Sequence, residues 1–76
     1  MKNYIVIDNI EYNTRHGGPF DRGSADSYYG RPKQPHFYVG ATAMSERIVP
    51  TDKSDAYWDY MAGYEWNERQ GHKKYQ

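Results

Sequence analysis

Basic and aromatic side chains alternate through the middle of the chain, in a pattern that suits nucleic-acid chemistry. The basic members are Arg22, Arg31, Lys33 and His36, and the aromatic members are Tyr28, Tyr29, Phe37 and Tyr38. Basic groups can bind a phosphate backbone while aromatic rings stack on unpaired bases. The pattern predicts a nucleic-acid site made by Arg22, Arg31, Lys33, His36 and Tyr38. The alternative is that the arginines pair with Asp21 and Asp26 and the rings form the core.

A second candidate site lies nearer the C-terminus. Trp58, Ala62 and Trp66 recur at every fourth residue, so they share one face of a helix. Tryptophan is a common anchor of protein interfaces. The pattern predicts a protein-binding face whose members are Trp58 and Trp66 with the surrounding carboxylates Asp55, Asp59 and Glu65. The alternative is that both rings pack beneath the loop of residues 31–45. The same face is also suited to closing a homodimer.

Other chemistry is disfavoured. Residues 18–24 have the outer glycine spacing of a phosphate loop but lack a lysine before Ser24. His16, His36 and His72 are 20 and 36 residues apart, so no two of them form a closely spaced pair of metal ligands. Paired carboxylates would need a water-excluding cleft, which a chain of 76 residues has little bulk to build. We therefore expect no metal, no cofactor and no catalytic site.

The composition limits which classes of partner and which cellular compartment suit this chain. Ten basic and ten acidic residues cancel, which disfavours binding driven by phosphate charge and excludes a strongly acidic DNA mimic. Cysteine is absent, so disulfide scaffolds and thiolate zinc modules are excluded. No apolar run reaches the roughly 18 residues of a membrane span, and residues 1–15 lack the pattern of a signal peptide. These features predict a cytoplasmic protein with no membrane partner.

The N-terminal segment reads as a β-hairpin over residues 3–14. Asp8-Asn9 suits a two-residue primed turn, because both residue types tolerate positive φ. This turn places Ile5 opposite Tyr12, and Ile7 opposite Ile10, on one face. We expect that face to cover the helices.

Two helices are expected after the hairpin. The first runs from Pro19 to Tyr29 and stops at Gly30. The second runs over residues 52–70, capped by Thr51 and ended by Gly71. Its core face is expected to carry four residues: Tyr57, Tyr60, Met61 and Tyr64.

The connecting segments complete a small α+β domain over residues 1–76. Residues 31–45 read as an ordered but irregular crossing, and residues 46–49 as a candidate third strand beside the hairpin. Residues 69–76 read as a basic, frayed tail. The predicted fold is an N-terminal β-hairpin packed on two helices, of which the second is long.

Residues 20–68 resemble the bacterial ribosome modulation factor, a short two-helix protein that binds ribosomal RNA. The shared motifs are Arg22-Gly23, Gly30-Arg31, Tyr38 and the aromatic-x-x-Gly-aromatic segment Tyr60-Met61-Ala62-Gly63-Tyr64. The resemblance implies two helices that approach closely at Gly23 and Gly63, and ribosome binding. That factor is strongly basic, whereas this chain is neutral, begins with a hairpin and has an acidic second helix.

The chain as a whole is similar to the small uncharacterised proteins that tailed bacteriophages make early in infection. Residues 16–31 carry this likeness. Proteins of that kind bind and inhibit a host enzyme or defence complex. The favoured expectation is therefore a non-enzymatic accessory protein that inhibits or redirects a host protein assembly. The alternative is a protein that binds the ribosome or another structured RNA.

Overall fold

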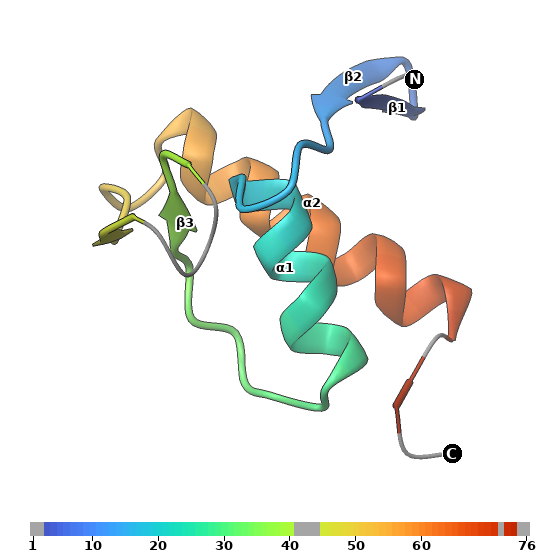
Figure 1. The fold of residues 1–76 in the computed structure, drawn as a ribbon. Coiled ribbons are helices and arrows are strands. Elements are labelled where there is room, and N and C mark those ends of the chain that lie inside the picture. The colour runs from blue at the N-terminus through green and yellow to red at the C-terminus, as the bar shows by residue number, and fades with distance from the viewer. Residues whose placement is uncertain (1–2, 41–44, 72, 75–76) are drawn as a thin grey trace.

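The predicted α+β architecture is confirmed by the computed structural model, which describes residues 3–40, 45–71 and 73–74. The elements in chain order are β1 (Tyr4–Ile7), β2 (Ile10–Asn13), α1 (Pro19–Tyr28), β3 (Phe37–Tyr38), β4 (Arg47–Ile48) and α2 (Asp55–Gln70). The two helices cross at the centre, and the hairpin stands beyond the start of α1 (Figure 1). Residues 41–44 of the predicted crossing, and residues 72 and 75–76 of the predicted tail, lie outside the described residues.

The hairpin has the predicted turn and register. Ile5 pairs with Tyr12 and Ile7 with Ile10 in the antiparallel ladder between β1 and β2. Asp8 and Asn9 have φ values of 51° and 66°, the left-handed pair that a primed turn requires. Tyr12 directs its ring inward, where it lies 5.4 Å from the ring of Phe20.

The two helices touch through their backbones at Gly23 and Gly63. A Cβ atom at Gly23 would overlap the carbonyl oxygen of Tyr60 and lie 2.9 Å from the amide nitrogen of Tyr64. A Cβ atom at Gly63 would overlap the carbonyl oxygen of Phe20. Each helix therefore offers a glycine where the other offers backbone, which confirms the close approach expected from the aromatic-x-x-Gly-aromatic motif.

The end of α1 follows the Schellman pattern. Gly30 has a φ of 70°, which costs glycine nothing because it has no Cβ. Its N–H donates to the Ser27 carbonyl, and the Arg31 N–H donates to the Asp26 carbonyl, at 3.0 and 2.8 Å. The stop predicted at Gly30 is confirmed.

The second helix begins later than predicted. Ser54, rather than Thr51, is its N-cap, and the Ser54 hydroxyl accepts a 3.3 Å hydrogen bond from the Tyr57 N–H. Lys53 has a φ of 64°, so the chain turns sharply before the cap and residues 52–54 stay outside the helix. The predicted end is confirmed, since Gly71 is the left-handed C-cap.

The predicted third strand exists, but the prediction that it lies beside the hairpin is wrong. Residues 47–48 form β4, which pairs with Phe37–Tyr38 in a separate two-stranded sheet. The crossing segment is thus less irregular than predicted. Tyr38 is held further by its N–H, which donates to the Gly17 carbonyl at 2.7 Å, so this small sheet is tied to the loop before α1.

The tail is not frayed where the structure describes it. Lys73 Nζ donates to the Ser27 carbonyl at 3.0 Å, and the Lys74 N–H donates to the Tyr28 carbonyl at 2.8 Å. These are carbonyls at the C-terminal end of α1, where the helix dipole attracts positive charge. The basic tail therefore caps the first helix.

Gly63→Ala is expected to destabilise the fold by about 2 kcal/mol, because steric overlap at the crossing outweighs the better helix propensity of alanine. Urea unfolding measures the loss. Gly40→Ala is the matched control, since a Cβ there meets Ser45 only at 3.8 Å, an ordinary contact. A Gly63→Ala variant as stable as the unmodified protein would contradict the close crossing.

Candidate functional site

His36 lies in the interior, although the sequence predicts it as part of a nucleic-acid surface. Its buried ring lies 5.7 Å from the Tyr60 ring and edge-on to the Tyr38 ring at 5.8 Å. Nδ1 lies 2.7 Å from the Gln34 carbonyl oxygen, and Nε2 accepts a 3.3 Å hydrogen bond from Arg22 Nε. Since a carbonyl only accepts, these contacts place the ring proton on Nδ1. Both nitrogens of His36 are thus occupied by the protein itself.

Asp26 is a buried carboxylate at the helix interface. The Tyr60 hydroxyl donates to its Oδ2, and Arg31 Nη1 lies 3.3 Å from its Oδ1. A buried charge is tolerated only when it is paired and hydrogen-bonded. Burial, reinforced by the hydrogen bond to Asp26, raises the pKa of Tyr60 well above its usual range. Asp26 therefore links α1 to α2 and to the loop that follows α1.

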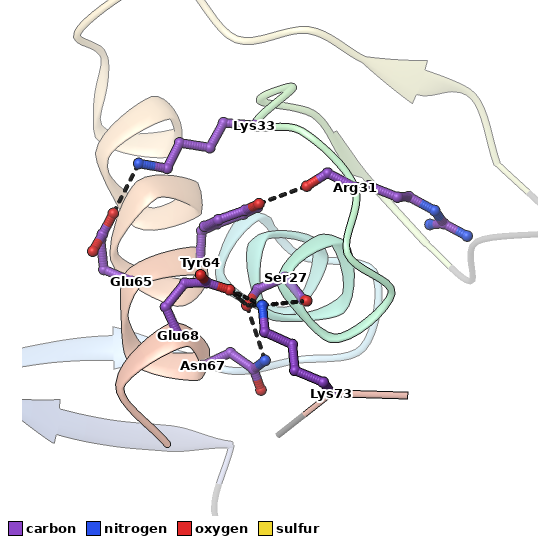
Figure 2. A network of polar contacts seen from close by, with 8 residues as sticks. All are labelled: Ser27, Arg31, Lys33, Tyr64, Glu65, Asn67, Glu68 and Lys73. Carbon is purple, nitrogen blue, oxygen red and sulfur yellow. Dashed lines mark hydrogen bonds and ion pairs between the residues drawn. The ribbon is translucent and has the colours of Figure 1, made fainter. Parts of the chain in front are cut away.

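Lys33, which lies in that loop, forms an ion pair with Glu65 of α2. Its Nζ lies 2.8 Å from Glu65 Oε1 and 5.4 Å from the centre of the Tyr64 ring. The hydrogen bond to Glu65 is the main reason that the pKa of Lys33 is raised. The Tyr64 hydroxyl donates to the Arg31 carbonyl at 2.5 Å, so two side chains of α2 hold the loop (Figure 2).

The predicted nucleic-acid residues do not form one exposed surface. The structure divides them into a cluster of the buried His36 with the half-buried Arg22 and Tyr38, and two surface residues, Lys33 and Arg31. Arg31 has 52% of its side chain exposed and lies over the Tyr29 ring at 4.7 Å. The alternative weighed from the sequence describes Arg31 well, since it pairs with Asp26. Arg22 instead binds His36.

Trp58 is exposed at a groove between α2 and the hairpin. Six residues line this groove of about 480 Å³, here termed the Trp58 groove: Ile10, Tyr12, Trp58, Met61, Ala62 and Glu65. Trp58 and Ile10 keep 52% and 54% of their surface exposed. Large apolar side chains gathered at a hollow are typical of a binding surface. The hairpin therefore supplies two of the six residues that line this groove, whereas the helix pattern alone predicts a flat face.

Trp66 lies apart from Trp58, contrary to the single face predicted for them. It is half-buried, and its ring lies 5.8 Å from that of Phe20. It lines a different hollow, on the side of the hairpin that faces α1. The described start of the predicted covering loop contacts other rings: the Gln34 N–H donates to the Tyr60 hydroxyl, and the Tyr64 hydroxyl donates to the Arg31 carbonyl.

The predicted acidic rim is only partly at the groove. Glu65 lines it, whereas Asp55 and Asp59 are not among its lining residues. Asp59 is half-buried, and burial is the larger cause of its raised pKa, followed by the charge of Asp55. Asp59 therefore carries an unfavourable charge in the folded protein at neutral pH.

A polar network that the sequence gives no sign of joins α1, α2 and the tail. Ser27 is fully buried, and its hydroxyl donates to Glu68 Oε2 while accepting a 3.0 Å hydrogen bond from Asn67 Nδ2. Lys73 Nζ pairs with the same Glu68 carboxylate and lies 3.3 Å from Ser27 Oγ. Figure 2 shows Lys73 reaching back across the end of α1 to reach these groups. The pairing of residues about 40 apart is invisible to local sequence patterns.

Metal and membrane features can be described only for the residues that the structure covers. Among these, no three histidine, aspartate or glutamate side chains gather as metal ligands would. Within the same residues, neither helix is long and apolar enough to cross a membrane.

Comparisons with protein-family models, with curated proteins and with solved structures gave no match to the chain. The resemblances described above therefore rest on the quoted motifs alone.

Glu68→Gln is expected to reduce the acid sensitivity of the fold. Hydrogen bonds from Lys73 and then Ser27 lower the pKa of Glu68 below 4.5. A carboxyl whose pKa is lower in the folded state stabilises the fold fully when the pH is above its pKa in the unfolded chain. This stabilisation is lost as the pH falls through its pKa in the folded protein. As the pH is lowered from about 6 to about 3, the free energy of unfolding should fall less steeply for Glu68→Gln than for the unmodified protein. An identical pH dependence would contradict the network.

Asp59→Asn is expected to stabilise the protein at neutral pH. Because the pKa of Asp59 is raised in the folded protein, its protonated carboxyl stabilises the fold at low pH. This stabilisation is lost as the pH rises through its pKa in the folded protein. Removing the charge should add about 0.5 kcal/mol by relieving repulsion with Asp55. Thermal unfolding at pH 7 compares the variant with the unmodified protein. The gain should vanish at low pH, where both carboxyls are protonated, and a gain that persists there would have another cause.

Proposed function

We propose that this protein acts by binding a partner protein through the Trp58 groove, without catalysing a reaction. In the setting that the likeness to small early phage proteins implies, the partner is a host protein assembly in the bacterial cytoplasm, which the bound protein inhibits or redirects. The exposed Trp58 at an apolar groove is the observation that carries this proposal.

The energetic basis is the surface that a partner would cover. Tryptophan is among the residues that most often dominate an interface, and its truncation there commonly weakens the binding free energy by about 2 kcal/mol or more. Ile10, exposed at the opposite wall, supplies a second apolar contact from the hairpin. Covering both side chains removes apolar area from water, which favours association. The groove is built from two elements, so its shape can select a complementary side chain.

Ribosome or RNA binding is supported less well. Arg22 donates to the buried His36, which packs edge-on against Tyr38, and Lys33 pairs with Glu65. Arg31 remains half exposed, but it pairs with Asp26 and lies over an aromatic ring. A net charge of zero adds no general attraction to phosphate. RNA binding would have to rely on a few surface cations near the end of α1.

Capture from bacterial lysate tests the proposal. Tagged protein is expected to retain a discrete protein partner after nuclease treatment and in moderate salt, because apolar contact is insensitive to both. Trp58→Ala should abolish capture, while Val49→Ala should not. Val49 is a suitable control since it is 67% exposed and does not line the groove. Circular dichroism shows whether each variant remains folded.

The RNA alternative makes the opposite prediction in the same assay. Its partner would be lost on nuclease treatment and would weaken steeply with salt. Arg31→Ala, which removes a half-exposed cation, would then reduce capture, whereas Trp58→Ala would not. That combination of results would overturn binding through the Trp58 groove.

A further inference from the structure

A second hollow, separate from the Trp58 groove, lies where the hairpin meets α1 and Trp66. Seven residues line it, and it is here termed the aromatic pocket: Tyr4, Ile5, Thr14, Phe20, Asp21, Ser24 and Trp66. Its volume is about 370 Å³, near the lower end of the roughly 300 to 1,000 Å³ typical of ligand pockets. A pocket of this size suits one long side chain rather than a large ligand.

Three side chains that line the aromatic pocket, Thr14, Asp21 and Ser24, carry oxygens that can accept hydrogen bonds. The Asp21 carboxylate accepts from the Gly17 N–H at 2.9 Å through Oδ2, and His16 Nδ1 lies 3.8 Å from that same oxygen. Within the described part of the chain, Asp21 Oδ1 and the hydroxyls of Ser24 and Thr14 have no protein hydrogen-bond partner. The pocket therefore presents a carboxylate oxygen and two hydroxyls to an incoming group.

Aromatic rings form the rest of the wall. The half-buried ring of Trp66 and the exposed ring of Tyr4 on β1 are accessible, and the buried Phe20 supports Trp66 from beneath with ring centres 5.8 Å apart. The faces of such rings attract cations, and arginine adds planar stacking on them. An anion would be repelled by Asp21, and a purely apolar group would cover that carboxylate without pairing it, which is costly. The combination selects a donor-rich cation.

We propose that the aromatic pocket binds an arginine side chain of the partner protein. The guanidinium would donate to Asp21 and the two hydroxyls while its plane stacks on the aromatic wall. The identity of the partner as a protein rests on the proposed function, whereas the pocket's preference for arginine does not.

The pocket and the Trp58 groove are close enough to serve one partner segment. Ala62 lines the groove and Trp66 lines the pocket, and a four-residue step along a helix covers about 6 Å. Tyr12, which lines the groove, and Ile5, which lines the pocket, are cross-strand partners on the same face of the hairpin. A partner that places an apolar side chain in the groove and an arginine nearby would engage both hollows.

A titration with a small arginine compound tests the pocket without any partner protein. Trp58→Phe leaves Trp66 as the single tryptophan, because the chain has two. N-acetyl-arginine amide should change Trp66 fluorescence saturably, in the millimolar range. N-acetyl-citrulline amide, which has the same shape but no charge, should bind about tenfold more weakly or not at all.

Asp21→Asn provides the matched variant, because an asparagine oxygen can still accept from the Gly17 N–H. It should weaken binding of the arginine compound about tenfold, while Glu65→Gln, which removes a charge that pairs with Lys33 and does not line the pocket, should leave it unchanged. Equal responses to the arginine and citrulline compounds, or full affinity in Asp21→Asn, would overturn the pocket. Loss of partner capture in Trp58→Ala is read separately, so failure of the pocket and failure of the proposed function are distinguishable.

Discussion

The backbone contact between Gly23 and Gly63 is the constraint on which the other features of this structure depend. With no side chain at either glycine, the carbonyls of Tyr60 and Phe20 lie where Cβ atoms would otherwise stand. At that spacing there is little room for an aliphatic core between the helices. The aromatic rings instead arrange themselves around the crossing, with Tyr60 and Phe20 fully enclosed. A chain with no leucine can build an interior in this way because each ring buries a large area.

The close crossing also explains why polar residues are buried. Asp26, Ser27 and Asn67 lie beside the glycines on the two helices and are too close to the interface to reach water. Each is satisfied from a distant segment: Asp26 by Tyr60 and Arg31, and Ser27 by Asn67, Glu68 and Lys73. Such a network is stable only when every group has a partner. Arg31, which the sequence predicts as part of a nucleic-acid site, is used for this purpose.

Local signals in the sequence predict the fold well. Asp8-Asn9 determines the hairpin register, Gly30 and Gly71 end the helices, and the glycines of the two helices meet as expected. The errors concern long-range pairing. Nothing local indicates that residues 47–48 pair with residues 37–38 rather than with the hairpin, or that Lys73 returns to Ser27. The separation of Trp58 from Trp66 was equally hidden, because it depends on Tyr12 of the hairpin packing on Phe20 of α1, which in turn packs on Trp66.

The account depends most on the helices touching at backbone distance, and nuclear Overhauser spectroscopy of the labelled protein measures this directly. The structure predicts a cross-peak between an α-proton of Gly23 and the amide proton of Tyr64, because the Tyr64 nitrogen lies 2.9 Å from where a Gly23 Cβ would stand. Helices separated by side chains would instead show contacts between rings and no cross-peak at the glycines. That result, in a folded protein, would contradict the crossing and the buried polar network built around it.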